Sequence, residues 1–127
     1  CLFLQRGTPC FYYGTELELD GGPDPDCRRA MPWERVSESN EMLNFMKKLI
    51  QLRKDASSII RHGKYSLKEI KPDVVSLEWN YDGQKVRAIF NQSKENYLVD
   101  SDSADLTSHC QELDNQLVIL PKGFVIE

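Results

Sequence analysis

The feature that most constrains the fold is a pair of alternating apolar runs on either side of Asp82-Gly83. Apolar side chains occupy every second position in residues 75–81 and again in residues 86–90. A period of two is typical of strands that bury one face. Asp-Gly supplies the two positive-φ residues of a tight hairpin turn. The sequence therefore predicts an antiparallel β-hairpin in the second half of the chain.

Shorter apolar stretches extend this hairpin into a larger β-structure. We predict strands over residues 65–70 and 97–99, and a last hairpin or a bulged strand over residues 117–126. Residues 100–116 are polar and irregular, which favours a surface loop. Short strands separated by turn signals are typical of two packed sheets. The fold class is therefore mainly β, with an antiparallel β-sandwich over residues 59–127.

Residues 41–56 follow a helical period instead. Acidic side chains precede or open this segment, and Arg53 and Lys54 close it, which suits the helix dipole at both ends. Apolar residues recur every three or four positions, and lysines lie on the opposite side. These features predict one amphipathic helix with an apolar side made of Met42, Phe45, Met46, Leu49, Ile50 and Leu52.

The run of residues 10–13 is apolar and lies between Pro9 and Gly14. It is too short for a helix and does not alternate, which favours a strand covered on both faces, as in a parallel sheet. Residues 1–6 are predicted as the end of a helix closed by Gly7. A long polar loop follows the strand. In parallel α/β folds, ligands bind at that end of the strands.

Two motifs in this region carry a resemblance to a known family. They are GTPCFYYGTE, over residues 7–16, and GGPDPDCRR, over residues 21–29, followed by Met31 and Trp33. The region resembles the eighth β/α unit of the α-amylase superfamily of glycoside hydrolases. The DPDCR element resembles its neopullulanase, cyclomaltodextrinase and maltogenic amylase branch. The resemblance implies that residues 1–58 are the last β/α unit of a TIM barrel and residues 59–127 its small C-terminal domain.

The resemblance also implies a function. It implies a parent enzyme that hydrolyses α-glucans with retention, at α-1,4 bonds and, as a further target, α-1,6 bonds. In this superfamily the catalytic carboxylates come from barrel strands four, five and seven, so this segment alone is expected to be inactive. Two alternatives stay open. One is a transferase or isomerase on the same scaffold, and the other is a non-catalytic β-sandwich that binds carbohydrate or stabilises its barrel.

Four loop residues are candidates for contact with substrate. By resemblance, Asp24 and Arg28 match a pair that hydrogen-bonds the glucose beyond the cleavage point on the non-reducing side. A carboxylate accepts from sugar hydroxyls and a guanidinium donates to them, so the pair fits a vicinal diol. The alternative is a salt bridge that only holds the loop. Tyr13 is expected to line the pocket, and Trp33 either stacks on a sugar face or covers the helix.

The composition argues against several classes of ligand and partner. The formal net charge is -4, from 16 basic and 20 acidic residues without a cationic patch, which argues against nucleic acid and anionic membranes. No stretch reaches the roughly 20 apolar residues of a membrane span. The cysteines and histidines lack metal-ligand spacing, so neither metal nor cofactor is expected, and reduced thiols favour a cytoplasmic location. The apolar faces of residues 1–56 predict self-association.

Overall fold

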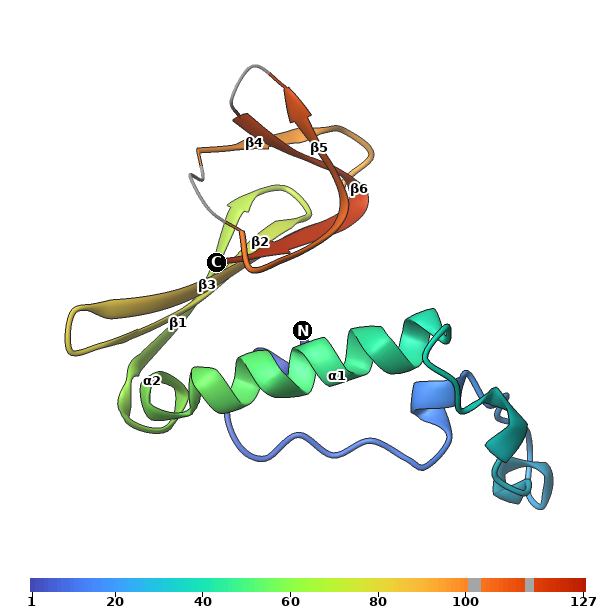
Figure 1. The fold of residues 1–127 in the computed structure, drawn as a ribbon. Coiled ribbons are helices and arrows are strands. Elements are labelled where there is room, and N and C mark those ends of the chain that lie inside the picture. Colours follow the sequence, from blue (N-terminus) through green and yellow to red (C-terminus); the bar gives the residue numbers. More distant parts are fainter. Residues whose placement is uncertain (101–103, 114–115) are drawn as a thin grey trace. The chain divides into compact units, whose positions relative to one another are not determined.

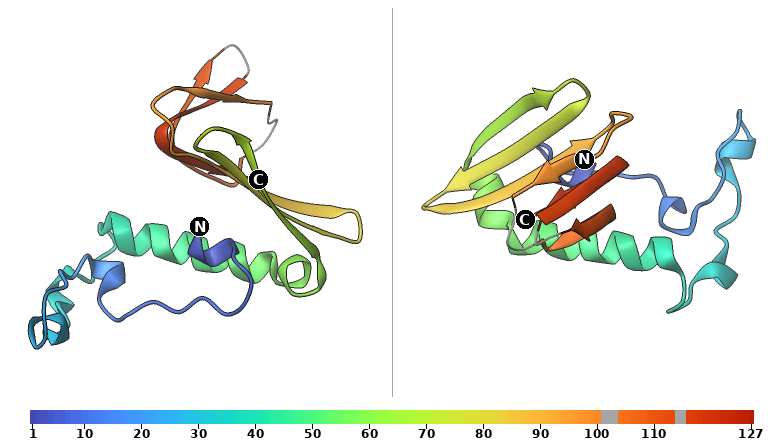
Figure 2. Two further views of the ribbon diagram at one scale, coloured as in Figure 1. Left: turned by 180° about the vertical axis from the view of Figure 1, so that it is seen from behind. Right: turned by 90° about the horizontal axis from the view of Figure 1, so that it is seen from above.

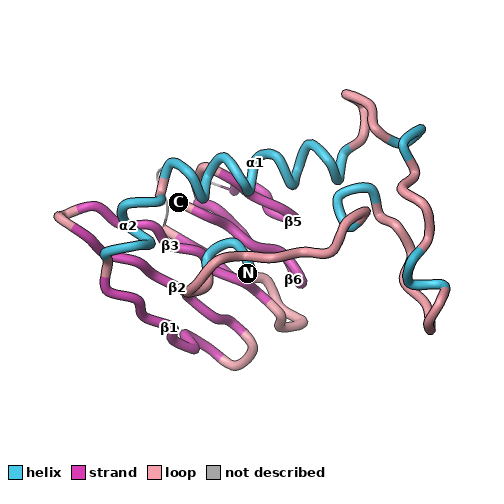
Figure 3. Tube along the Cα trace, turned by 90° about the horizontal axis from the view of Figure 1, so that it is seen from below, coloured by secondary structure: helices cyan, strands magenta, loops and turns pink. Residues whose placement is uncertain are grey.

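The computed structural model describes residues 1–100, 104–113 and 116–127. They divide into two compact units, Cys1–Lys54 and Asp55–Glu127. The first unit consists of loops, short 3-10 turns and one long helix, whereas strands fill most of the second (Figures 1 and 3).

Within the described residues of the second unit, six antiparallel strands form one curled sheet (Figures 1 and 2). The strand order is β1-β2-β3-β6-β4, and β5 pairs with β6 off this path. The first half of the sheet is a simple meander, because each strand pairs with the next along the chain. The strands are β1 (Lys64–Lys71), β2 (Val74–Tyr81), β3 (Gln84–Asn91), β4 (Tyr97–Val99), β5 (Leu106–Leu113) and β6 (Gln116–Ile126).

The structure confirms the predicted hairpin. β2 and β3 pair without a register shift along their whole length. Asp82 and Gly83 have φ values of 49° and 75°, the left-handed conformation that a two-residue turn of this kind requires. Trp79 is buried, whereas Tyr81 is 40% exposed near the turn, where its ring lies 5.6 Å from that of His62. The alternation therefore predicts the burial of Leu77 and Trp79 correctly, but it misses the exposure of Tyr81 and the burial of Ser76 on the opposite face.

β6 is a bulged strand that pairs with strands in both halves of the sheet. Its C-terminal half pairs with β3 and its N-terminal half with β4, while β5 pairs along most of its length. Between the halves, Lys122 has a φ of 62°. At Gly123 an added Cβ would lie 2.5 Å from the carbonyl oxygen of His109, so only glycine fits there. Of the two predicted alternatives, the bulged strand is the one found.

The curl of the sheet buries a core between its two halves. The core side chains come from β2, β3, β4 and β6, and each is at most 4% exposed. Burying an aliphatic side chain of this size stabilises a fold by roughly 1.5–3 kcal/mol. The arrangement is sandwich-like, as predicted, but both layers belong to one sheet because β6 passes from one to the other. The core consists of Val74, Ile89, Val99, Ile119 and Val125.

The other face of β2 and β3 is also covered. Leu77 and Ala88 are opposite each other on these strands and are fully buried. Helix α2 (Ser57–His62) contacts β2, and its Ile60 is buried. The sequence analysis did not predict α2, because six residues are too few to show a helical period. This outer face of the meander is therefore apolar at its centre.

β5 is a correction to the sequence analysis. Residues 100–116 were predicted as a surface loop, yet Leu106–Leu113 form a strand paired with β6. None of its described side chains is buried, and most are polar, so no apolar period marks the strand. Backbone hydrogen bonds to β6 hold it in place. Residues 101–103 and 114–115 of the predicted loop lie outside the described residues.

In the first unit, helix α1 (Glu41–Asp55) confirms the predicted amphipathic helix. Asn40 caps its start, because the Asn40 side-chain oxygen accepts a hydrogen bond from the Leu43 N–H at 2.8 Å. Near its end, the Arg53 guanidinium donates to three backbone carbonyl oxygens of the N-terminal segment. These belong to Phe3 at 2.6 Å, Gln5 at 2.9 Å and Gly7 at 2.6 Å.

The strand predicted over residues 10–13 is not found. These residues pair with no strand in the described chain, and their side chains are exposed instead of covered on both faces. A parallel strand forms only beside neighbours that accept its backbone hydrogen bonds. The first residues form a 3-10 turn, η1 (Leu2–Leu4), instead of the end of an α-helix. The TIM-barrel unit predicted for residues 1–58 therefore stays a prediction.

Candidate functional site

The candidate site lies on the loop between residues 15 and 40, which was predicted as a long loop. Its fold comes from its own contacts. Leu17 is buried, and the Arg35 guanidinium donates to the carbonyl oxygens of Leu17 at 3.1 Å and Glu18 at 3.2 Å. Sequence reasoning missed Arg35, because one arginine in a polar loop gives no periodic signal. The loop contains the 3-10 turns η2 (Thr15–Leu17), η3 (Asp26–Arg28) and η4 (Trp33–Arg35).

Asp24 and Arg28 lie side by side on this loop. The Arg28 Nε atom is 3.2 Å from Asp24 Oδ1, and the side chains are 69% and 65% exposed, in that order. The turn η3 brings them together, because it folds the chain back over the four positions that separate them. An ion pair this exposed stabilises a fold by about 0–1 kcal/mol. Both side chains keep further donor and acceptor atoms open to solvent.

Tyr13 is joined to the same part of the loop. Its hydroxyl donates a hydrogen bond to the carbonyl oxygen of Arg29 at 2.8 Å. Since Arg29 follows Arg28, this bond brings the Tyr13 ring into the neighbourhood of the ion pair. The Tyr12 and Tyr13 rings lie 4.5 Å apart. The pKa of the Tyr12 hydroxyl is raised above its ordinary value. The largest cause is desolvation, and the electrostatic interaction with the neighbouring Tyr13 hydroxyl is the second.

Trp33 begins the turn η4, and its side chain is 72% exposed. An indole in that position offers a flat apolar face to solvent. Stacking on a sugar and covering a helix both stay predictions for this residue. The structure thus brings three of the four candidate residues, Tyr13, Asp24 and Arg28, into one neighbourhood and leaves the fourth exposed on the same loop.

None of the His, Cys, Asp and Glu side chains in the described residues form a group of three or more that could hold a metal ion. The cysteines Cys1, Cys10, Cys27 and Cys110 are free thiols. No helix in the described part of the chain combines the length and apolarity needed to span a membrane.

Comparison with known proteins places this chain in a family. The chain is 42% identical over 93 residues to an intracellular maltogenic amylase of Bacillus subtilis, a match to 72% of this chain and 16% of that protein. It is 33% identical over 127 residues to a maltogenic alpha-amylase of Bacillus acidopullulyticus, covering 95% of this chain and 21% of that protein. The chain is related to the C-terminal part of the maltogenic amylases of the α-amylase superfamily. No protein-family model matches it.

The amylase relationship extends to the three-dimensional fold. The structure resembles the crystal structure of a maltogenic amylase from S. marinus with a TM-score of 0.76 and 28% identity, over 98% of this chain and 18% of that one. Cyclomaltodextrinases and a neopullulanase are among the further sequence relatives. This amylase-related chain spans about a fifth of the length of the relatives it matches, between 16% and 21% for the two maltogenic amylases above.

Proposed function

We propose that the chain is the C-terminal part of an enzyme that hydrolyses α-glucans with retention, at α-1,4 bonds and with α-1,6 bonds as a further target. The 42% identity to a maltogenic amylase over 93 residues is the observation that carries this proposal. Residues 1–58 would complete a TIM barrel as its last β/α unit, and residues 59–127 form the domain that follows. The intracellular relative supports a cytoplasmic location.

In this proposal, the loop grips substrate and does not cleave it. Arg28 donates from its fixed fork to one hydroxyl of a glucose unit, and Asp24 accepts from its neighbour. The 3.2 Å contact between the two side chains supports this role, because it holds both groups ready for a vicinal diol. Tyr13 forms part of the pocket wall, and Trp33 stacks on a sugar face.

The cleavage itself requires groups from elsewhere in the parent enzyme. A retaining mechanism uses two carboxyl groups about 5–5.5 Å apart, one as nucleophile and the other as acid and then base. In the resemblance, both come from barrel strands upstream of this segment. Residues 1–127 alone are therefore proposed to be inactive.

The test uses Asp24→Asn and Arg28→Ala in the full-length parent enzyme, with a maltooligosaccharide as substrate. Hydrogen bonds to a charged group contribute about 1.5–3 kcal/mol, so kcat/KM should fall roughly tenfold to a hundredfold in each variant. Asp26→Asn and Arg29→Ala are the matched controls, because they change the neighbouring charges of the same sign and leave the pair intact. Their kinetics should stay unchanged.

The same variants separate the proposal from its alternative. If the pair only holds the loop, Asp24→Asn and Arg28→Ala lower the unfolding temperature while kcat/KM stays at the level of the controls. That result would remove Asp24 and Arg28 from the substrate site, even if the parent enzyme is confirmed as an amylase.

A further inference from the structure

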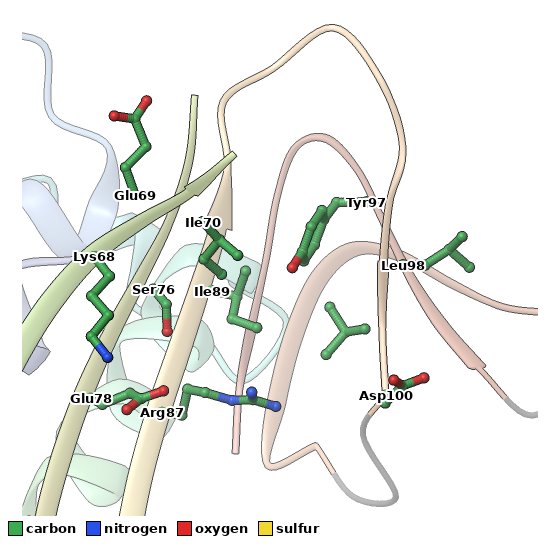
Figure 4. A pocket seen from close by; sticks show the side chains of 11 residues that line it. Lys68, Glu69, Ile70, Ser76, Glu78, Arg87, Ile89, Tyr97, Leu98 and Asp100 are labelled. Carbon is green, nitrogen blue, oxygen red and sulfur yellow. The ribbon is translucent and has the colours of Figure 1, made fainter. Parts of the chain in front are cut away.

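A groove of about 550 Å³ lies inside the curl of the sheet in the second unit (Figure 4). Ser76 of β2 and Ile89 of β3 lie at its floor. β1 lines one side, and the segment from Tyr97 to Asp100, which includes β4, lines the other. Pockets of about 300–1,000 Å³ are the size that holds small organic molecules. The groove shares no residue with the loop proposed to bind glucan.

One buried polar group of this groove, the Ser76 hydroxyl, is without a partner among the described residues. Ser76 is 6% exposed, and its buried hydroxyl oxygen has no hydrogen bond among the described residues. A buried hydroxyl without a partner is destabilising, so an oxygen of a ligand that bonds to it is favoured. Lys68 and Glu78 form no ion pair with any described residue. They lie on either side of Ser76, since Lys68 is opposite it on β1 and Glu78 follows it on the same face of β2.

The charges at this end of the groove balance each other. Lys68 and Arg87 are cationic, and Glu78 and Asp100 are anionic (Figure 4). Arg87 is already held in place, because its Nε atom donates to Glu127 Oε1 at 2.6 Å. Asp100 accepts a hydrogen bond from Gln116 Nε2 at 3.1 Å. Arg87 is opposite Glu78 in the register of β2 and β3, but its guanidinium is engaged with Glu127, so Lys68 and Glu78 are the two charges in the groove without an ion pair among the described residues. One charge of each sign favours a head group that carries both.

The other end of the groove is apolar. Ile70 lines it from β1, and the ring of Tyr97 faces Ile89, whereas the Leu98 side chain points away from the groove (Figure 4). The Lys71 ammonium lies 5.3 Å from the centre of the Tyr97 ring, a cation–π contact between β1 and β4. The groove thus has a charged end and an apolar end. A sugar would place hydroxyl groups against the apolar end and lose their hydration there.

We propose that this groove binds a small amphiphilic zwitterion, such as a free amino acid with an apolar side chain. The ligand carboxylate accepts from the Lys68 ammonium and the Ser76 hydroxyl. Its ammonium donates to the Glu78 carboxylate, and its side chain packs between Ile70, Ile89 and the Tyr97 ring. The site is independent of the proposed glucan activity, because it lies wholly on β1 to β4 and Asp100.

Isothermal titration of the whole chain with L-leucine tests the site. Saturable binding with a dissociation constant of about 1 mM is expected for a ligand of this size and exposure. 4-Methylpentanoate, isoamylamine and glycine lack the ammonium, the carboxylate and the apolar side chain of leucine, in that order, so each should bind about tenfold more weakly. Absence of leucine binding, or binding of maltose as tight as that of leucine, would overturn the proposal.

Variants then locate the bound ligand. Lys68→Met and Glu78→Gln should each weaken leucine binding about tenfold, and Ser76→Ala about threefold. Ser76→Ala should also leave the unfolding temperature unchanged or raised, because it removes a hydroxyl that has no partner. Lys64→Met, on the same strand but outside the groove, is the control and should bind normally. Leucine affinity at the control level in the Lys68 and Ser76 variants would show that the groove is not the site.

Discussion

At the scale of single residues, the first unit depends on one guanidinium. Arg53 lies in the last turn of α1 and bonds the carbonyl oxygens of Phe3, Gln5 and Gly7. These three carbonyls lie in a segment without α-helix or strand, so few other backbone partners are available to them. Partial burial lowers the pKa of Arg53 from its ordinary value, yet a guanidinium stays protonated at neutral pH. The guanidinium therefore keeps its charge and its donor hydrogens at physiological pH.

We expect Arg53→Ala to release the N-terminal segment from α1. Three hydrogen bonds from a charged donor are lost, and because the side chain is partly solvated the cost should be about 2 kcal/mol in the free energy of unfolding. The measurement is the urea unfolding midpoint. Lys54→Ala, which removes an exposed neighbouring charge, is the control and should shift the midpoint little. Equal midpoints for the two variants would contradict a role for Arg53 in holding this segment.

At the scale of elements, the bend of β6 is the feature on which the sheet depends. Gly123 lies in close contact with the backbone of β5, and the register shift of β5 lies beside it, between Ser108 and Cys110. β-bulges of this kind increase local bending and twist. The bend allows the two halves of β6 to pair with β3 and with β4.

We predict that Gly123→Ala destabilises the second unit by about 1–3 kcal/mol, the usual cost of forcing atoms into a packed site. The added methyl group would meet the His109 carbonyl oxygen at 2.5 Å. Gly21→Ala is the control, because nothing lies within 4 Å of its added Cβ. Thermal unfolding followed by far-ultraviolet circular dichroism measures both. If Gly123→Ala lowers the unfolding temperature no more than Gly21→Ala does, the backbone of β5 can shift to accommodate the added methyl group, and the prediction is wrong.

Elements with a strong local pattern could be predicted from the sequence. The hairpin of β2 and β3 has both alternation and an Asp-Gly turn, and α1 has a long helical period with charges suited to its ends. β5 could not be predicted, because it is held by backbone pairing and not by apolar side chains. The strand expected at residues 10–13 has no pairing partner among the described residues, and a four-residue apolar run does not by itself distinguish a covered strand from an exposed segment.

The candidate site was predictable only in part, for a related reason. A motif singled out Asp24 and Arg28, which are four positions apart, and in the structure the turn η3 brings them into contact. The Arg35 bonds to the carbonyls of Leu17 and Glu18 join positions far apart in the sequence, and no local pattern indicates them. The groove residues likewise come from separate strands. Their proximity follows from the curl of the sheet, which no short stretch of the sequence indicates.

At the scale of the whole molecule, the first unit exposes an unusual set of large apolar side chains. Several aromatic rings among them lie open to solvent. Exposed apolar surface of this kind marks an interface. The set includes Leu2, Phe11, Tyr12, Tyr13, Trp33 and Val36.

We therefore expect the isolated chain to self-associate through residues 1–56. The apparent mass from light scattering should rise with protein concentration, because association buries this surface. Tyr12→Ser combined with Trp33→Ser should shift the equilibrium toward monomer, and Lys47→Ser, on the polar side of α1, should leave it unchanged. A single monomeric species at all concentrations would contradict this expectation.

The passage of β6 through both layers has a consequence for how the second unit opens. In a sandwich of two separate sheets, one sheet can detach while the other keeps its hydrogen bonds. Here neither layer can be withdrawn intact, since the same backbone segment completes each of them. Amide protons of β3 and of β4 should then become accessible to exchange in a single concerted event, which makes the unit one cooperative body despite its two-layered form.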